Sequence, residues 1–138
     1  ARITTNGFKV TSGALGVNID PSTTDGRIDA TNDVVAFSSS DKRLKENIKP
    51  LDNALDKVSK ISGVEFDWKP LTEEEKKTIH GNEGHDVGVI AQEIEKVLPE
   101  VVTTRDSGYK AVKYEKIVPL LIEAIKEQQK QIEELKNG

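Results

Sequence analysis

Apolar residues in positions 1–40 recur at every second position within short runs. The runs are Phe8 and Val10; Leu15, Val17 and Ile19; and Val34 and Ala36. Turn-forming sequences such as Asn6-Gly7 and Ser12-Gly13 separate them, together with the stretch 20–26. Alternation with a period of two indicates short β-strands joined by frequent turns. Because such strands bury little area, we expect residues 1–40 to pair with neighbouring chains or with an upstream domain.

The pattern changes at Ser40, after which the chain is charged and partly helical. Apolar spacings of three and four predict helices, and alternation predicts strands. The elements expected here are a helix over about 52–61, a strand over 64–68, a short helix opened by the capping box 72–75, a strand over 87–90, a helix over 91–98, and a hairpin of 101–105 with 110–113 around the turn 106–108. Trp68, at the end of its strand, is expected in the core. The predicted fold class is α+β, divided into residues 1–40 and 41–138.

The longest predicted helix covers about residues 114–136 and carries one narrow stripe. The stripe consists of Val118, Leu121, Ile125, Gln128, Ile132 and Leu135, spaced alternately by three and four residues. Such spacing also suits an amphipathic helix packed on its own domain. Between Glu127 and Lys136, however, the only apolar residues belong to the stripe, which favours a coiled-coil seam and self-association. In the heptad repeat of a coiled coil, Ile at position a with Leu at position d favours an assembly of two helices, and Gln128 at a d position weakens that preference.

Composition narrows the classes of function. The chain of 138 residues has a formal net charge of −4, which argues against nucleic acid as a partner. It contains no Cys, which excludes disulfides and thiolate metal sites. No apolar run is long enough to span a membrane, so a membrane partner is not expected. The hydrophobic fraction of 35% is low and suits a core completed by further copies of the chain. Because Met is absent, we expect an internal fragment or a trimmed product.

Ser40 and Lys45 lie at the change in composition and form a candidate catalytic pair. A serine and a lysine can carry out acyl transfer without histidine when the lysine is neutral enough to accept the hydroxyl proton. A free lysine has a pKa of about 10.4, and burial or a nearby cation such as Arg43 would lower such a value. The nearest peptide bond belongs to the chain itself, so the predicted activity is self-cleavage. On the residues alone, a flexible Ser-rich linker beside solvated charges is the ordinary interpretation and is favoured over catalysis.

Other candidate sites carry less chemistry. His80 and His85 lie with Glu83 and Asp86 in a Gly-rich loop that resembles a metal site in composition. His-x4-His in a loop lacks the helical geometry of recognised zinc motifs. A solvated loop or a contact between chains accounts for these residues more simply. No phosphate-binding glycine loop is present, and neither a metal nor a cofactor is predicted.

The run Ser-Asp-Lys-Arg-Leu-Lys-Glu-Asn-Ile, from Ser40 to Ile48, resembles the opening of the C-terminal intramolecular chaperone domains of phage tailspikes and tail fibres. These domains are also classed as a family of self-cleaving serine peptidases, first recognised in endosialidase tailspikes. Three further segments, 88–95, 99–102 and 114–127, fit the pattern in the same order. The resemblance covers about residues 40–138.

The resemblance implies a domain that holds three chains in register while an upstream β-rich fibre shaft folds, and that then cuts itself off. The family's serine falls on Ser40 and its lysine on Lys45. The cut then lies among Ser39, Ser40 and Asp41, with the side of Ser40 left open. Residues 1–40 would be the end of the shaft, and the last helix would form a homotrimeric coiled coil. We expect assembly in the host cytoplasm, a shaft retained in the virion tail fibre, and a released chaperone. The alternative is a permanent, non-catalytic trimeric fibre tip that contacts a host receptor.

Overall fold

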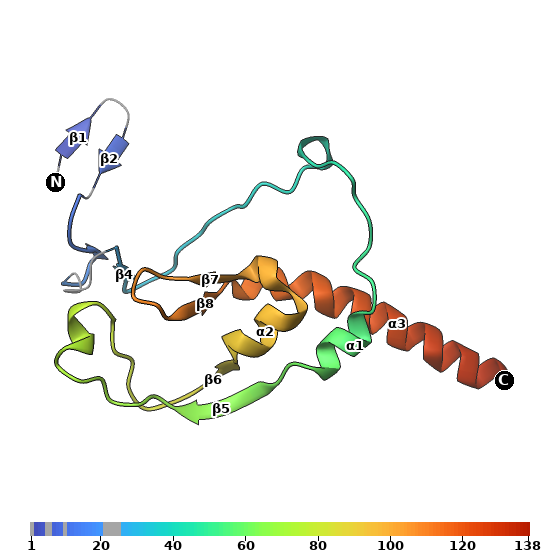
Figure 1. The fold of residues 1–138 in the computed structure, drawn as a ribbon. Helices are drawn as coiled ribbons and strands as arrows, with labels where there is room; N and C mark the ends of the chain where they lie inside the picture. Colours follow the sequence, from blue (N-terminus) through green and yellow to red (C-terminus); the bar gives the residue numbers. More distant parts are fainter. Residues whose placement is uncertain (1, 5–6, 10, 21–25) are drawn as a thin grey trace. The chain divides into compact units, whose positions relative to one another are not determined.

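The computed structural model describes residues 2–4, 7–9, 11–20 and 26–138 of the chain (Figure 1). The chain divides into two compact units. The first consists of residues 1–44 and 69–82, and the second of residues 45–68 and 83–138. Short strands, short helices and one long helix make the fold mixed α+β, which confirms the predicted class.

The first unit begins with two-stranded ladders. Strands β1 (Arg2–Thr4) and β2 (Gly7–Lys9) pair antiparallel, whereas β3 (Leu15–Val17) pairs parallel with β4 (Ile28–Ala30). The strand expected at Val34 and Ala36 is wrong: this stretch is irregular, and Val34 is 75% exposed. Alternation alone is not enough, because a strand is stabilised only by a neighbour to pair with. Val10 and most of the expected turn, residues 21–25, lie outside the described residues.

The predicted capping box lies in the second segment of the first unit. The backbone N–H of Thr72 donates to Glu75 Oε2 (2.8 Å), and the backbone N–H of Glu75 donates to Thr72 Oγ1 (3.2 Å). These reciprocal bonds confirm the capping box. The element that it opens, η2 (Glu75–Lys77), is a single 3₁₀ turn and not an α-helix. An isolated helix this short is unfavourable unless tertiary packing supports it.

The second unit holds most of the regular structure. Its elements are α1 (Ala54–Ser59), β5 (Gly63–Asp67), β6 (His85–Val89), α2 (Ala91–Val97), η3 (Pro99–Val101), β7 (Val102–Thr104), β8 (Lys110–Val112), η4 (Tyr114–Ile117) and α3 (Val118–Asn137). β5 pairs antiparallel with β6, and β7 pairs antiparallel with β8. Pro119 lies in the first turn of α3, where its missing N–H leaves no helical bond unmade. The helices, strands and hairpin predicted for this part of the chain are confirmed, with ends shifted by a few residues.

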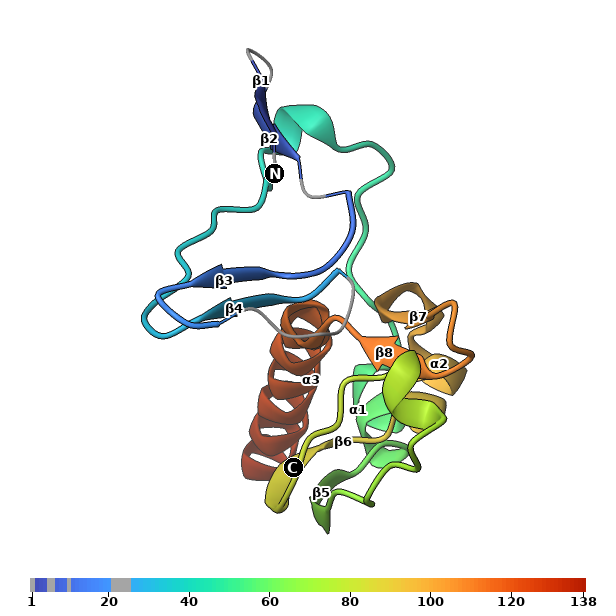
Figure 2. The ribbon, with the colours of Figure 1, turned by 90° about the vertical axis from the view of Figure 1, so that its left-hand side faces the viewer.

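The core of the second unit is formed by its helices. In both views α1 lies alongside α3 (Figures 1 and 2). Ile94 of α2 and Leu120 of α3 are the largest fully buried side chains among the described residues, each 1% exposed. Ala54 of α1 and Ala124 of α3 are also buried, as expected where two helices approach closely. Truncating a fully buried leucine or isoleucine to alanine costs about 2–5 kcal/mol, so this cluster dominates the stability of the unit.

Trp68 is 40% exposed, so its expected place in the core is wrong for the single chain. The residue follows the end of β5, and its ring meets Phe66 edge-on with 4.9 Å between ring centroids. Its indole N–H donates to Asp86 Oδ2 (3.0 Å). The backbone N–H of Val87 and, next, the Trp68 indole hold the pKa of Asp86 below its usual value. The indole thus uses its polar edge at the surface, a common arrangement for tryptophan.

Gly88 of β6 permits a close approach by Tyr114 of η4. A Cβ atom at position 88 would lie 2.6 Å from the Tyr114 hydroxyl oxygen. That hydroxyl accepts a hydrogen bond from the backbone N–H of Val89 (3.2 Å). Any side chain at position 88 would therefore displace the tyrosine from β6. The contact ties the segment that leads into α3 to the β5–β6 sheet.

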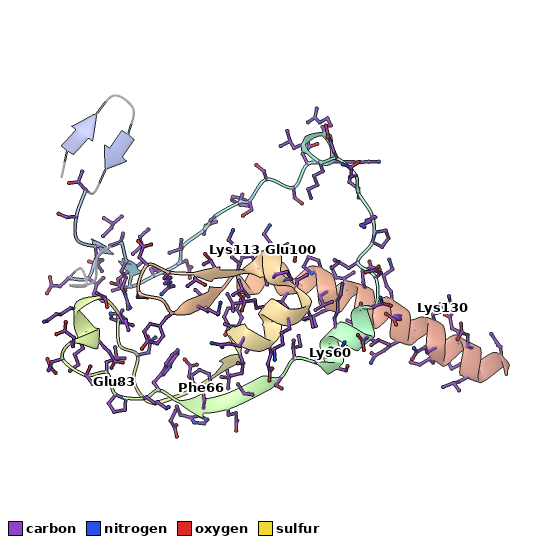
Figure 3. The ribbon with its side chains drawn as sticks, viewed as in Figure 1. Lys60, Phe66, Glu83, Glu100, Lys113 and Lys130 are labelled. Atoms are coloured by element: carbon purple, nitrogen blue, oxygen red, sulfur yellow. The ribbon has the colours of Figure 1, made fainter. Side chains whose placement is uncertain are left out.

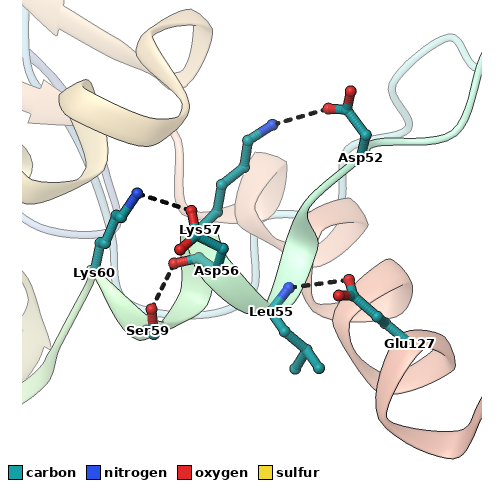
Figure 4. A network of polar contacts seen from close by, with 7 residues as sticks. All are labelled: Asp52, Leu55, Asp56, Lys57, Ser59, Lys60 and Glu127. Carbon is teal, nitrogen blue, oxygen red and sulfur yellow. Dashed lines mark hydrogen bonds and ion pairs between the residues drawn. The ribbon is translucent and has the colours of Figure 1, made fainter. Parts of the chain in front are cut away.

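The first turn of α1 receives its cap from α3 (Figure 4). Asn53, which precedes α1, has a left-handed backbone (φ 51°), and its side chain makes no cap hydrogen bond. The backbone N–H of Leu55 instead donates to Glu127 Oε2 (3.2 Å). The first N–H groups of a helix have no partner within the helix, and a carboxylate near them also interacts favourably with the helix dipole. Glu127 therefore ties the start of α1 to α3.

We expect Glu127→Ala to lower the free energy of unfolding by about 1 kcal/mol, because this is the usual cost of losing a helix cap. Glu127→Gln keeps an acceptor oxygen and should lose less. Glu134→Ala, which removes an exposed carboxylate further along α3, is the matched control and should be nearly neutral. Chemical denaturation followed by circular dichroism measures all three. An equal loss for the variants at positions 127 and 134 would contradict the capping role.

Candidate functional site

Ser40 and Lys45 lie on either side of a short turn in an exposed stretch of the chain. Residues 33–41 have no regular secondary structure, and η1 (Lys42–Leu44) is a single 3₁₀ turn. All residues from 31 to 50 are exposed, including Ser40 and Lys45. The boundary between the two units falls after Leu44, so Ser40 belongs to the first unit and Lys45 to the second. An exposed and irregular stretch is the kind of backbone at which peptide bonds are open to cleavage.

The carboxylate of Asp41 organises the turn. Asp41 Oδ1 accepts hydrogen bonds from the backbone N–H of Arg43 (2.8 Å) and from Arg43 Nε (3.1 Å), and Oδ2 accepts one from Arg43 Nη2 (2.9 Å). The Asp41 carbonyl also accepts from the backbone N–H of Leu44 (3.1 Å). The Arg43 side chain and, next, its backbone N–H hold the pKa of Asp41 below its usual value, and Asp41 raises the pKa of Arg43. The charge of Arg43 is thus directed at Asp41.

The pairing of Arg43 with Asp41 differs from the expectation from the sequence, which is a cation acting on Lys45. The signal for the pairing was available, because an aspartate two residues before a donor is the spacing of an Asx-turn. An Asp-x-Arg sequence at the start of a turn brings the guanidinium fork back toward the carboxylate. The bidentate geometry seen here is the strong form of that pair.

The chain between Lys45 and α1 contains two asparagines with positive φ. Asn47 has φ 52° and Asn53 has φ 51°, a conformation that asparagine tolerates better than most residues other than glycine. Leu44 and Ile48, on either side of Lys45, are 74% and 61% exposed. Lys45 is therefore flanked by two apolar side chains that the single chain leaves at its surface.

The predicted seam lies on a face of α3 that its own chain leaves exposed. The exposed fractions are 52% for Val118, 42% for Leu121, 64% for Ile125, 45% for Ile132 and 82% for Leu135, and Gln128 is exposed as well. Leu120 and Ala124 lie on the adjacent face and are buried. The helix thus uses one face for packing within the chain and presents its apolar stripe beside it. The last turns of α3 extend past α1 (Figure 1), and residues 128–138 are all exposed.

The two histidines of the Gly-rich loop belong to different units, His80 to the first and His85 to the second. His85 Nδ1 lies 3.0 Å from Asp67 Oδ1 on the neighbouring strand. Within the described ranges, no group of three or more His, Cys, Asp or Glu residues is arranged to hold a metal ion. The described part of the chain also contains no helix with the length and hydropathy to cross a membrane.

Comparison with known protein families identifies one matching region. Residues 40–103 match the family Peptidase S74, described as chaperone of endosialidase. The matched region begins at Ser40, the first residue of the candidate pair, and ends at Thr103 within β7. It therefore includes the Asp41–Arg43 turn, both candidate catalytic residues and the helices α1 and α2.

The chain is also similar to several phage proteins named long tail fiber protein Gp37. It is 40% identical over 107 residues to that of Enterobacteria phage K3, which covers 73% of this chain and 8% of the relative. For Salmonella phage S16 the values are 37% over 103 residues, 71% of this chain and 13% of the relative. The protein of Enterobacteria phage M1 is 38% identical over 109 residues, which cover 76% of this chain and 41% of the relative. The chain spans less than half the length of each of these relatives.

Proposed function

We propose that the chain is the intramolecular chaperone of a phage tail fibre, because its residues 40–103 match the Peptidase S74 family of endosialidase chaperones. It associates as a homotrimer, holds the upstream shaft chains in register while they fold, and then releases itself by cleavage at Ser40. The observation that carries this proposal is that the family match begins at Ser40, the first member of the Ser–Lys pair.

In the proposed reaction Ser40 is the nucleophile and Lys45 the general base. Ser40 Oγ attacks a peptide carbonyl carbon while Lys45 Nζ takes the hydroxyl proton. Attack on the carbonyl of Ser39 closes a five-membered ring. The bond between that carbon and the Ser40 nitrogen then breaks as the nitrogen receives the proton from Lys45, which leaves an ester. Water hydrolyses the ester to a carboxyl terminus at Ser39 and a free Ser40.

A serine from a neighbouring chain can attack on either side of Ser40, so the bond next to Asp41 is also a candidate. Backbone N–H groups have to stabilise the negatively charged oxygen of the intermediate. The exposed and irregular backbone of residues 33–41 supports the proposal, because such a segment can adopt the geometry that attack requires.

Assembly supplies the change in environment that the reaction needs. A lysine acts as a general base only in its neutral form, which burial favours. Lys45 is exposed in the single chain, between the exposed apolar side chains of Leu44 and Ile48. A neighbouring chain that covers these two side chains also removes Lys45 from water. Cleavage is then conditional on correct assembly.

The exposed stripe on α3 supports self-association. A helix with an apolar seam is unstable in water until other helices cover the seam. The residues of the stripe alone favour a coiled coil of two helices, and the family resemblance favours one of three helices, so we propose a trimer. The chain up to the cut, which ends at Ser39 or at Ser40 according to the bond broken, is then the end of the shaft and stays in the virion tail fibre. The remaining residues act during assembly in the host cytoplasm and are released.

A permanent trimeric fibre tip that contacts a host receptor without cleavage is the second candidate. The exposure of both Ser40 and Lys45 in the single chain is the observation that favours it. In that case α3 keeps the chains together, and the Ser–Lys pair has no chemical role. The two candidates differ in one measurable property, the covalent continuity of the chain at Ser40.

Intact mass over time separates these candidates. The chain is expressed with an upstream shaft segment, purified and followed by mass spectrometry. We expect the full-length species to convert to two fragments whose masses meet on one side of Ser40. The same masses identify the broken bond. A chain that associates and keeps its full-length mass indefinitely would favour the permanent tip.

A further inference from the structure

Gln128 is the polar member of the otherwise apolar stripe on α3. It lies between Ile125 and Ile132, which are 64% and 45% exposed, and its own side chain is exposed as well. An apolar residue at this position would bury more hydrophobic area once other helices cover the stripe. A glutamine here therefore lowers the stability of the proposed coiled coil, and a polar residue in a seam is known to specify how the chains align at just such a cost.

The amide of Gln128 has no hydrogen-bond partner among the described residues of its own chain, whereas the polar residues on either side of it do. Glu127 Oε2 accepts from the backbone N–H of Leu55 (3.2 Å). Gln129 Nε2 donates to Glu133 Oε1 (3.1 Å). An amide that is buried without a partner is unfavourable. Because each amide carries both donors and an acceptor, copies of Gln128 from neighbouring chains can satisfy one another when they lie at the same level.

The apolar residues of the stripe do not fix the register of the chains, because they repeat every seven residues. The a positions are all β-branched, and the d positions other than 128 are leucines: Val118, Ile125 and Ile132 at a, and Leu121 and Leu135 at d. A slip of seven residues again places β-branched residues on β-branched residues. At the d positions, however, the same slip places Gln128 against a leucine and leaves its amide without a partner.

The geometry points to Gln128 as the residue that fixes the axial register of α3 in the trimer, through hydrogen bonds between copies of its amide. The inference rests on the proposed function, because it requires the trimer. A slip of seven residues offsets two helices by about 10 Å, which is the length of about three residues of an extended strand. Shaft strands that pair between chains would be misaligned by that offset. Gln128 thus supplies the alignment that the proposed chaperone has to pass to the shaft.

The absence of Cys from the chain permits a direct measurement of register by disulfide formation. Chains with Ile125→Cys and chains with Ile132→Cys, each with its shaft, are co-expressed, and the disulfides are equilibrated in a glutathione buffer. A disulfide requires its two Cα atoms to lie within about 7 Å. Aligned chains therefore join equal positions, whereas a mixed disulfide between positions 125 and 132 requires a slip of one heptad. Mass spectrometry of the unreduced peptides distinguishes the two products.

With Gln128 in place, mixed disulfides should be at least about a hundredfold rarer than those between equal positions, because a slipped trimer leaves three amides without partners. Gln128→Leu makes the seam uniform, so mixed disulfides should become comparable in amount to the others. The Tm should rise at the same time, because leucine is buried in place of an amide. Gln128→Asn keeps an amide at this level and should keep mixed disulfides rare.

Gln129→Leu is the matched control, since it makes the same substitution at an exposed position next to the stripe. Mixed disulfides should stay rare in this variant. Circular dichroism and light scattering establish that each variant folds and associates. Because Gln128 is exposed in the single chain, its replacement leaves the core of the second unit intact.

The outcomes separate this inference from the proposed function. Trimers of Gln128→Leu in which mixed disulfides stay rare would overturn the role of Gln128 in register and leave the proposed chaperone standing. Mixed disulfides that are equally abundant with glutamine and with leucine at position 128 would overturn it as well. Folded wild-type chains that stay single in light scattering and form no disulfides in the cysteine variants would overturn the proposed trimer and this inference together.

Discussion

Ser40→Ala and Lys45→Ala should each leave a chain that associates normally and never separates from its shaft. Loss of the nucleophile removes the only group that forms the proposed ester, so cleavage should slow by at least about a thousandfold. Loss of a general base typically costs about 10²–10⁴ in rate. Both side chains are exposed in the single chain, so neither substitution disturbs the core. Denaturing gels over a time course give the rates, and light scattering gives the oligomeric state.

Ser38→Ala is the matched control for the nucleophile, since it removes the same hydroxyl from the same serine run. It should cleave at the wild-type rate. Lys42→Ala is the matched control for the proposed base, since it removes a lysine from the same turn, and it should also cleave at the wild-type rate. Cleavage of Ser40→Ala or Lys45→Ala at the wild-type rate would contradict the assignment of that residue as nucleophile or as general base. If both variants also failed to form trimers, the segment would instead have a role in assembly.

The local periodicity of the sequence predicts much of the second unit. The pattern from Ala91 to Leu98 gives α2, and the turn at residues 106–108 gives the β7–β8 hairpin. Both elements follow from residues close together in the chain. The capping box formed by Thr72 and Glu75 is also confirmed, because its two bonds span only three residues. Elements whose stabilising contacts are local can be predicted without the fold.

Contacts between distant residues could not be predicted in the same way. The cap that Glu127 provides for α1 joins residues 72 positions apart, and nothing in the local pattern at either residue indicates it. The approach of Tyr114 to Gly88 is another such contact, although glycine at a strand position is a general sign of close approach. At Val34 the alternating pattern predicts a strand, but the structure is irregular there because no neighbouring strand pairs with this stretch.

The same distinction between local and distant contacts applies to the proposed site. Asp41 and Arg43 are two residues apart, so their pairing is a local property of the turn. The burial of Lys45, in contrast, is a property of the proposed assembly, because the single chain leaves this residue exposed. A sequence motif can therefore indicate which groups react, while the condition that activates them depends on surfaces of other copies of the chain.

Replacing Ile125 and Leu121 together by aspartate should convert the proposed trimer into single chains. Burying an isoleucine or leucine side chain contributes about 1.5–3 kcal/mol, and each substitution removes that contribution from every chain of the trimer. The new carboxylates would also be buried close together in the seam, which adds repulsion and desolvation. Leu120 and Ala124, on the adjacent face of α3, still pack within the chain. The secondary structure of the second unit should therefore be retained in the dissociated protein.

Lys130→Asp is the matched control for charge on the same helix. Lys130 lies on the exposed part of α3 (Figure 3), and its position in the repeat is outside the seam formed by residues 125, 128 and 132. This variant changes the charge by more than a single Ile→Asp substitution does, and it should stay trimeric. Light scattering at several protein concentrations measures the oligomeric state, and circular dichroism measures helicity. Because cleavage is proposed to depend on assembly, the seam variant should also lose self-cleavage while Lys130→Asp keeps it. Monomers that cleave as fast as the wild type would show that burial by neighbouring chains does not activate Lys45.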